Sequence, residues 1–284
     1  MSLVIGIDVG GSTTKIVGIE NASHIKSSMI ITANDPITSL FGAFGKYLYD
    51  NDIALEDIEH VMLTGVGASG MTTPIYGLPT THVDEFLADG LGARFDSGLD
   101  KLIVVSMGTG TTLVRVDGDV IKHIGGISMG GGTLQGLSHL LLKTSRIDEV
   151  VKLASHGDIS HINLQIKDIS EKDIEGLPMY ATASLFGKAL STNATTEDIA
   201  KGLICMVLET IGSCAVLSQV NDNIKDFVLI GNLSQLPECQ LIFPMMESLY
   251  GVRFHIPGHA RYCTALGAAI SYHQYTKNDQ PIVN

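Results

Sequence analysis

The sequence predicts an α/β protein with two lobes. Short apolar runs rich in β-branched residues alternate with segments of helical periodicity. A strand, a glycine turn and a second strand occur twice, as "VIGIDVGGSTTKIV" from Val4 and as "IVVSMGTGTTLVRV" from Ile103. The two copies lie roughly a hundred residues apart, which is too far for a solenoid and natural for duplicated lobes. A chain of 284 residues with 45% hydrophobic residues can bury a core in each lobe.

The first lobe begins with a predicted hairpin. Leu3 to Asp8 and Thr14 to Ile19 are strand-like runs on either side of the Gly10-Gly11 turn. Apolar residues at helical spacing then predict a helix over 36–49, which ends at an Asp-Asn-Asp breaker. The next segment, "HVMLTGVGA", predicts a strand that runs into a glycine loop. This order of elements indicates an α/β lobe.

The second lobe repeats the opening and adds helices. Strands are expected on both sides of the glycine turn and after a tight Asp117-Gly118 hairpin. A helix is predicted in "TLQGLSHLLLKTS". The segment from Arg146 to Leu190 is predicted to be an insertion of short helices and polar turns. Thr195 to Asp198 form a cap for a buried helix from Ile199 to Val220. "DFVLIGNLSQLP" predicts a strand, a glycine turn and a helix start, and the last segment a strand, a loop and a closing helix with small residues on one face.

These elements predict a domain boundary near residue 98. Residues 1–98 form the first lobe, with a glycine hairpin and an acidic segment. Residues 99–284 form the second lobe, with the second hairpin, the third glycine turn and the insertion. The closing helix is long enough to pack back on the first lobe.

Composition and charge narrow the class of function. The formal net charge is −12 and no run of Lys and Arg is dense, which argues against nucleic acid and anionic membranes as partners. The four cysteines, Cys205, Cys214, Cys239 and Cys263, lie far apart and form no CxxC pair, so neither a zinc ribbon nor a disulfide framework is indicated. No apolar run is long enough to span a bilayer, and no leader is evident. We therefore expect a cytoplasmic protein that acts on small molecules.

The glycine loops predict anion binding. Glycine lets backbone N–H groups approach an anion closely and tolerates positive φ. The opening loop lacks the spacing of a P-loop and returns as a strand, so it does not match a dinucleotide fingerprint either. Two such hairpins facing each other across a cleft would hold a phosphate chain from both sides, although each loop alone is equally consistent with a simple turn.

This arrangement resembles the superfamily of acetate kinase, sugar kinases, Hsp70 and actin. The resemblance implies a two-lobed actin-like ATPase fold, made of duplicated ribonuclease H-like domains, with ATP in the cleft between the lobes. It also implies that Asp8 holds hydrated Mg²⁺, whose charge reverses the repulsion between an aspartate and phosphate. The residues that it assigns to the phosphates are Gly10, Gly11, Ser12, Thr13, Lys15, Gly108, Thr109, Gly110 and Thr111.

Four segments narrow the resemblance. "GGSTTK", "GTGTT", "GGISMGGGTLQGLSHLL" and "IGN" are similar, in this order, to the signature segments of type II pantothenate kinases, and the similarity covers most of the chain. It implies ATP-dependent phosphorylation of pantothenate to 4'-phosphopantothenate, the first step of coenzyme A biosynthesis, by a homodimer. Gly130, Gly131 and Gly132 would hold ATP phosphates on free N–H groups at a helix start. Gly231 belongs to the adenosine motif.

The resemblance also implies a catalytic base and a substrate side. Glu85 in "HVDEFLADGLGA" is the implied base, because a carboxylate can orient a primary hydroxyl and take its proton. The neighbouring Asp84 is the alternative, and both are equally typical of a solvated helix start. Pantothenate would contact Thr109, His123 and Tyr262. His123 stands where the family has an arginine and cannot make a bidentate contact with a carboxylate. Either Arg115 or Arg261 compensates for it, or the acceptor differs. Tyr262 is equally suited to the core.

Three alternatives remain open at the level of sequence. The opening loop also resembles that of the ATPases that activate 2-hydroxyacyl-CoA dehydratases, which hold an iron–sulfur cluster between two subunits. That function needs two exposed cysteines in each subunit and a Gly-Gly-Gln-Asp loop, which this chain lacks. A kinase of the same fold acting on another small alcohol, and a nucleotide-dependent regulatory protein without an acceptor, are the other two.

Overall fold

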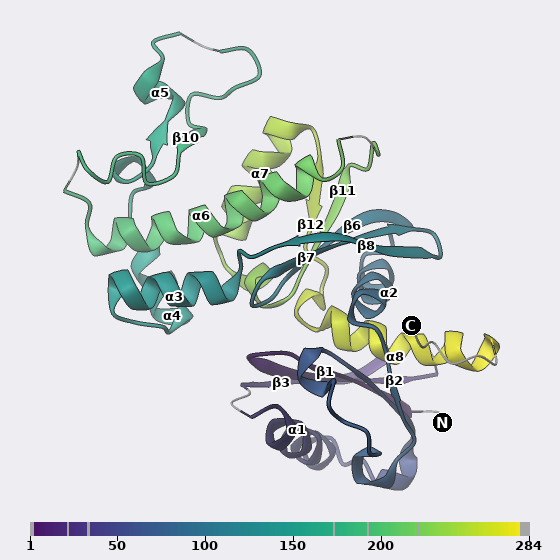
Figure 1. Ribbon diagram of the computed structural model, residues 1–284. Coiled ribbons are helices and arrows are strands. Elements are labelled where there is room, and N and C mark those ends of the chain that lie inside the picture. Colours follow the sequence, from purple (N-terminus) through teal and green to yellow (C-terminus); the bar gives the residue numbers. More distant parts are fainter. Residues whose placement is uncertain are drawn as a thin grey trace.

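Two five-stranded sheets with the same connectivity form the framework of the molecule (Figure 1). The computed structural model describes residues 3–21, 23–32, 35–172, 174–191, 193–220 and 222–278. The first sheet has the order β3-β2-β1-β4-β5 and the second the order β12-β11-β6-β7-β8. In each sheet three antiparallel strands are followed by two parallel ones. The predicted α/β class and the duplication of the lobes are confirmed.

The strands of the two sheets are short, and the inner strands are largely buried. Those of the first sheet are β1 (Leu3–Val9), β2 (Thr13–Glu20), β3 (His24–Thr32), β4 (Ile58–Thr64) and β5 (Thr80–His82). Those of the second are β6 (Lys101–Met107), β7 (Thr111–Asp117), β8 (Val120–Ile127), β11 (Asp226–Ile230) and β12 (Arg253–His255). The predicted hairpins β1–β2, β6–β7 and β7–β8 are all present.

The helices cover both faces of each sheet (Figure 1). Helix α1 (Pro36–Asp50) packs on the outer face of the first sheet. Helices α2 (Glu85–Ser97) and α8 (Cys263–Asn278) lie between the two sheets and contribute to the cores on both sides. The outer face of the second sheet is covered mainly by α3, α6 and α7. The bounds are α3 (Gly131–Leu142), α4 (Ile147–Ala154), α5 (Ile166–Ile169), α6 (Thr196–Leu217) and α7 (Cys239–Tyr250).

Glycines allow α2 and α8 to cross in backbone contact. A Cβ on Gly92 would lie 1.9 Å from the carbonyl oxygen of Cys263, and a Cβ on Gly267 would lie 1.8 Å from that of Ala88. No side chain fits at such distances, so both positions require glycine. The predicted small-residue face of the closing helix is this contact surface. Although α8 is last in the sequence, it packs on the first sheet as well as on α2.

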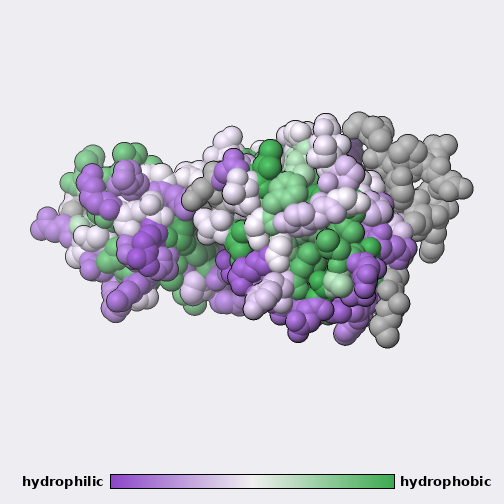
Figure 2. Space-filling model, turned by 90° about the horizontal axis from the view of Figure 1, so that it is seen from below, coloured by the Kyte–Doolittle hydropathy of each residue, from purple (hydrophilic) through white to green (hydrophobic). Residues whose placement is uncertain are grey.

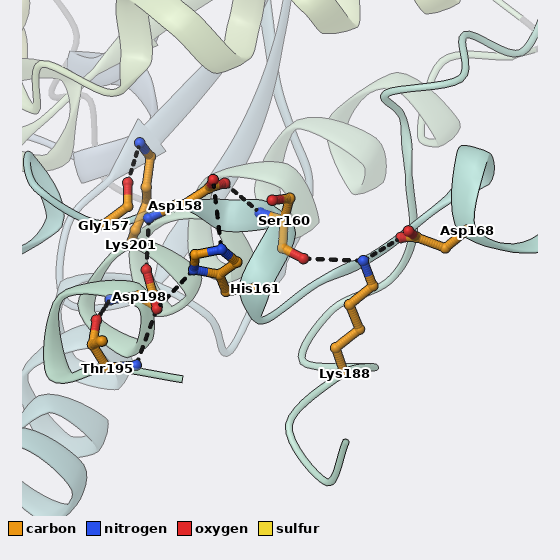
Figure 3. A network of polar contacts seen from close by, with 9 residues as sticks. All are labelled: Gly157, Asp158, Ser160, His161, Asp168, Lys188, Thr195, Asp198 and Lys201. Carbon is orange, nitrogen blue, oxygen red and sulfur yellow. Dashed lines mark hydrogen bonds and ion pairs between the residues drawn. The ribbon is translucent and has the colours of Figure 1, made fainter. Parts of the chain in front are cut away.

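A polar network ties the insertion to the start of α6 (Figure 3). Asp198 accepts hydrogen bonds from the backbone N–H groups of Asp158 (2.7 Å) and Thr195 (3.0 Å) and contacts His161 Nδ1 at 3.2 Å. The predicted helix cap is present, and Thr195 and Asp198 form a capping box. These bonds lower the pKa of Asp198 to about 2 against the effect of its burial. The insertion is therefore held at its base by ionised, hydrogen-bonded groups.

The strands β9 (Leu164–Gln165) and β10 (Thr182–Ser184) form a small separate sheet within the insertion. Short 3-10 turns occur at Leu55–Asp57, Val66–Ala68, Ile75–Gly77, Ile159–His161, Asn232–Gln235 and Ala260–Tyr262. In Figure 1 the part of the insertion with α5 and β10 stands apart from the two sheets, whereas α4 lies beside α3.

Helix α6 is the central helix of the second core, as its apolar sequence predicted. By length and composition it is the one described helix that could cross a membrane, which the sequence reading had not anticipated. The structure gives it another role, because 56% of that apolar window is buried within the molecule and α6 residues such as Leu203, Val207 and Ile211 are almost inaccessible. Its hydropathy is accounted for by packing against α3, α7 and the second sheet.

The surface of the first lobe mixes apolar and polar side chains. The view from below shows hydrophobic surface interspersed with hydrophilic residues on this side (Figure 2). Exposed large apolar residues of this lobe include Ile37, Tyr49, Leu55 and Tyr76. Scattered apolar residues are common on the surfaces of folded proteins, so these exposed side chains do not by themselves indicate a binding site.

Candidate active site

The two glycine hairpins face each other across a cavity of about 430 Å³. The first loop connects β1 to β2, and the second connects β6 to β7. They approach closely, because a Cβ on Gly11 would lie 3.7 Å from Thr109 Oγ1. Of the residues predicted to bind phosphate, the cavity is lined by Gly10, Gly11, Ser12, Thr13, Lys15, Gly108, Thr109, Gly110 and Thr111. The duplicated motif has thus produced one shared site.

A second cavity, of about 760 Å³, lies on the other side of the same loops. Both cavities are lined by Ser12, Thr13, Gly108, Thr109 and Asn232. The second one extends to the start of α3, to the turn after β11 and to Arg261. A chain of phosphates held by the loops would therefore have one cavity at each end, which suits a nucleoside on one side and an acceptor on the other.

The glycine turn after β11, which was predicted to hold adenosine, joins the two lobes at this point. Asn232 Nδ2 donates to Thr13 Oγ1 at 3.4 Å, and Arg261 Nε donates to Asn232 Oδ1 at 3.4 Å. Gly231, which was predicted for the nucleotide, lines the first cavity and has φ +89°. A Cβ there would lie 2.6 Å from the carbonyl oxygen of Met107. Sequence reasoning identified the glycine but not the roles of Asn232 and Arg261.

Asp8 and Lys15 form a buried ion pair on the floor of the first cavity. They are cross-strand neighbours on β1 and β2, and Lys15 Nζ lies 3.0 Å from Asp8 Oδ2. Burial acts against the charged ammonium, but the charge and hydrogen bond of Asp8 outweigh it and raise the pKa of Lys15. The site therefore keeps the positive charge of Lys15, paired with Asp8, beside the glycine loops.

Glu85 projects into the cavity from the first turn of α2. Partial burial raises the pKa of its carboxyl, and the negative charge of Asp8 adds to this effect while Lys15 opposes it. The alternative residue, Asp84, is exposed, and its Oδ1 accepts a hydrogen bond from the backbone N–H of Leu87 at 2.9 Å. Asp84 is the N-cap of the helix. The two adjacent carboxylates thus face different environments, and only Glu85 lines the cavity.

Asp89, which the sequence analysis did not single out, is a buried neighbour of Glu85. It lies one helical turn after Glu85, is almost completely buried, and accepts a hydrogen bond from Thr264 Oγ1 at 2.7 Å. Its Oδ2 has no hydrogen-bond partner within the described residues. Burial is the main cause that raises its pKa to about 7, and the charge of Glu85 contributes. The i, i+4 spacing from Glu85 was the available signal, since it places both carboxyls on one helix face.

The glycines at the start of α3 have a different role from the one expected. The N–H of Gly131 donates to the carbonyl oxygen of Gly108 at 2.8 Å, and that of Gly132 donates to Thr109 at 2.9 Å. A Cβ on Gly130 would lie 2.6 Å from the carbonyl oxygen of Thr109. The expected free N–H groups of Gly131 and Gly132 are thus already used to brace the second glycine loop. Gly131 and Gly132 still line the second cavity.

Two of the three predicted substrate contacts lie outside the cavity lining. Thr109 lines both cavities. His123 is exposed on β8, and its ring stacks on Phe86 with centroids 4.1 Å apart and an angle of 8° between the planes. Tyr262 packs against the core between α8 and the first sheet, which corresponds to the alternative expected from the sequence. His123 is therefore next to the site through Phe86, whereas Tyr262 has a packing role.

The donor set near Asp8 fits Mg²⁺ shared with phosphate. Mg²⁺ in phosphoryl-transfer sites commonly takes one or two carboxylates and completes its shell with water and phosphate oxygens. Asp8 supplies such a carboxylate beside the glycine loops, and one of its oxygens is engaged by Lys15. Within the described ranges, no three His, Cys, Asp or Glu side chains form a closed metal site. The residues present therefore suit a metal that arrives with the nucleotide.

Solved structures share this fold at low sequence identity. The activator of 2-hydroxyisocaproyl-CoA dehydratase from Clostridium difficile, solved with bound ADPNP, has a TM-score of 0.67 and 19% identity over 99% of this chain and 98% of its own. The ROK hexokinase from Thermus thermophilus has a TM-score of 0.58 and 13% identity over 97% of this chain and all of its own. The predicted two-lobed fold of the actin-like ATPases and sugar kinases is confirmed.

Sequence relatives narrow the family. Type II pantothenate kinase from Staphylococcus epidermidis is 28% identical over 279 residues, 93% of this chain and 98% of its own. Pantothenate kinase 1 from Arabidopsis thaliana is 32% identical over 194 residues, which are 62% of this chain and half of the plant protein's length. The Fumble family model matches residues 100–270. The chain belongs to the Fumble family, which is the pantothenate kinase family.

Proposed function

We propose that this protein phosphorylates pantothenate at the expense of ATP and forms 4'-phosphopantothenate, the first step of coenzyme A biosynthesis. The observation that carries the proposal is the position of Glu85 in a cavity bounded by both phosphate-type glycine hairpins. A carboxylate at the end of a phosphate chain suits transfer to a primary alcohol. Membership of the Fumble family supports pantothenate as the acceptor.

In the proposed reaction, the two glycine loops hold the phosphates and Asn232 and Arg261 border the nucleoside. Glu85 orients the primary hydroxyl of pantothenate and accepts its proton. The hydroxyl oxygen forms a bond to the γ-phosphorus as the bond to the bridging β–γ oxygen breaks, and ADP leaves. Lys15 contributes positive charge close to the transferring group. Mg²⁺, held through Asp8, would neutralise phosphate charge when ATP is bound.

The proposal is tested by the dependence of ATP consumption on acceptor. ADP formation is measured with Mg²⁺ and ATP, with and without pantothenate, and the product is identified by mass spectrometry. Strong stimulation with formation of phosphopantothenate is expected. Stimulation only by another small alcohol would leave the fold and the base in place and overturn the acceptor. Slow ATP turnover that no alcohol stimulates would instead favour the regulatory ATPase.

The dehydratase-activator alternative has little support from the cysteines. Cys205, Cys239 and Cys263 are buried, and burial raises the pKa of Cys205 and Cys239 to about 12. Cluster ligands are thiolates, so these two thiols are poor candidates. Protein purified without oxygen should be colourless and free of iron. Stoichiometric iron–sulfur absorbance would reinstate the alternative.

The homodimer and the cytoplasmic location stay predictions from the family resemblance. Size measurement in solution by light scattering tests the first of these. A mass of twice 30.2 kDa is expected.

A further inference from the structure

A third cavity lies in the second lobe, between the insertion and the helices α6 and α7. It has a volume of about 190 Å³ and shares no lining residue with the two cavities beside the glycine loops. The insertion contributes residues of the segment 177–182 to its wall, and α6 and α7 contribute the rest. In Figure 1 the insertion with β10 lies above α6. An apolar cavity of about 150 Å³ is enough to bind benzene, so the third cavity has room for a ligand built around one ring.

Apolar and aromatic side chains make up most of the lining of the third cavity. Ile242 and Met246 of α7 are buried, while Tyr180, Met245 and Tyr250 are large side chains that remain exposed. The methionine side chain is flexible and polarisable and adapts its shape to a bound group. This lining suits a ligand with an apolar or aromatic body.

One acid group lies within this apolar lining. Glu209 of α6 is partly buried, and burial raises the pKa of its carboxyl. Among the residues that the structure describes, Thr182 Oγ1 is the only hydrogen-bond donor to this carboxylate, at 3.2 Å. A carboxylate can accept about four hydrogen bonds, so Glu209 can accept further bonds from a ligand.

The described residues that line the third cavity include no basic side chain. Glu209 therefore has no counter-ion within the cavity. An anionic ligand would be repelled by it, and a neutral donor would supply a hydrogen bond alone. A cation would supply the hydrogen bond and also the charge attraction, which is stronger beside apolar walls than in water. The rings of Tyr180 and Tyr250 also favour a cation over a neutral group.

We propose that the third cavity binds a small organic cation, in which an ammonium or amidinium group is carried on one aromatic ring or on an apolar group of similar size. The cationic group pairs with Glu209, and the apolar body packs against the methionine and tyrosine side chains of the lining. Because the walls come from the insertion and from two helices, a bound ligand holds the insertion against α6 and α7. The site is separate from the cavities of the proposed phosphoryl transfer and does not depend on that function.

The test compares three small compounds of similar size by ligand-observed NMR titration of the intact protein. They are 2-phenylethylamine, its uncharged analogue 2-phenylethanol, and the anion 3-phenylpropionate. The amine is expected to bind with a Kd on the order of 1 mM and about tenfold more tightly than the alcohol, because its hydrogen bond to Glu209 is charge-assisted. The anion should bind more weakly than the alcohol. Saturation with the amine should slow hydrogen exchange in residues 177–182.

Three variants assign the binding to this cavity. Glu209→Gln keeps the size of the side chain and an acceptor for Thr182 but removes the charge, so it should abolish the preference for the amine while the alcohol binds as before. Ser213, one helical turn further along the same face of α6, also lines the cavity. Ser213→Phe should fill the cavity and weaken both compounds about tenfold. Glu238→Gln is the matched control, since burial raises the pKa of that carboxyl too but Glu238 does not line the cavity, and the preference should persist.

Circular dichroism confirms that each variant is folded. The proposal is overturned if the wild type binds the amine and the alcohol equally, or if Glu209→Gln keeps the preference for the amine. It is also overturned if the amine does not bind at concentrations up to about 10 mM, or if it slows exchange only outside the walls of the third cavity. None of these results would alter the proposed reaction with pantothenate, which is measured separately.

Discussion

At the scale of single residues, three neighbouring carboxyl groups lie in different surroundings. Asp8 is held in an ion pair with Lys15, Glu85 is partly buried with a raised pKa, and Asp89 is buried with a pKa of about 7. A group that must accept a proton near neutral pH benefits from a raised pKa. The three carboxyl groups therefore differ in their surroundings: one lies in an ion pair, one is partly buried beside the cavity, and one is fully buried.

The raised pKa of Glu85 predicts the acidic limb of the activity profile. The proposed base works when it is ionised, so kcat/KM for pantothenate should fall as the pH drops through the pKa of Glu85 in the free protein. Because burial and Asp8 raise that pKa, the midpoint of the limb should lie above the ordinary glutamate value of 4.5. Steady-state kinetics from pH 4 to 8 at low concentrations of pantothenate measure it. A limb at or below 4.5 would contradict the assigned environment.

Asp89 predicts a pH-dependent stability. Between pH 3.8 and about 7 the unfolded chain has released this proton and the folded protein keeps it. The free energy of unfolding therefore falls as the pH rises across this interval, by up to ~4 kcal/mol from this group. Asp89→Asn should be more stable than the wild type at pH 8 and similar to it at pH 4. Urea unfolding at both values is the check, and equal stabilities at pH 8 would refute the prediction.

Where a motif constrains the chemistry, the structure brings the predicted residues together. Asp8, the glycine loops and Glu85 all line one cavity, and their roles stay predictions. Asp89 was missed because a carboxylate on a helix is most often solvated, and only the packing of Thr264 from α8 against it makes it a buried group. The prediction that the N–H groups of Gly131 and Gly132 are free was wrong. They bind carbonyls of a loop more than twenty residues earlier in the chain, and the local sequence does not reveal that contact.

At the scale of elements, the crossing of α2 and α8 holds the two lobes together. A methyl group at Gly267 would overlap the backbone of Ala88. Gly267→Ala is therefore expected to destabilise the protein by about 3 kcal/mol or more, because backbone cannot move aside as a side chain can. Gly136→Ala is the matched control, since a Cβ there has open space within α3 and should stabilise by about 0.5–1 kcal/mol.

Thermal and urea unfolding of the two alanine variants measure this difference. A Gly267→Ala protein as stable as the wild type would show that the helices separate easily, contrary to the packing described here. Loss of stability in Gly136→Ala as well would show that glycine flexibility, and not the crossing, is the cause.

Elements with a strong local pattern were predicted, whereas elements defined by their neighbours were not. The hairpins, α1, α3 and α6 follow from periodicity, turns and caps, and were found within a few residues of the expected bounds. Strands β3 and β5 were missed. Residues of β3 are only partly buried and lie at the sheet edge, and β5 has three residues. Their strand character comes from pairing with β2 and β4, which local sequence does not encode.

At the scale of the whole molecule, duplication creates the site. Each sheet contributes one hairpin loop, and the loops meet because α2 and α8 set the two sheets face to face (Figure 1). The repeated motif predicted both loops and predicted that they face each other across one cleft. The distance between them, and the division of the site into two cavities, depended on the helix crossing and became known only from the structure. The predicted division at residue 98 stays a prediction.

The central claim is that phosphoryl transfer occurs between these loops with Glu85 as the base. It is tested most directly by transfer of labelled γ-phosphate from ATP to pantothenate in the wild type, in Glu85→Ala and in Asp84→Ala. Removal of a general base should lower kcat by about 10²–10⁴-fold in Glu85→Ala, with ATP binding retained. Asp84→Ala should lose about 1 kcal/mol of stability as a helix cap and keep its activity. Full transfer by Glu85→Ala would contradict the account.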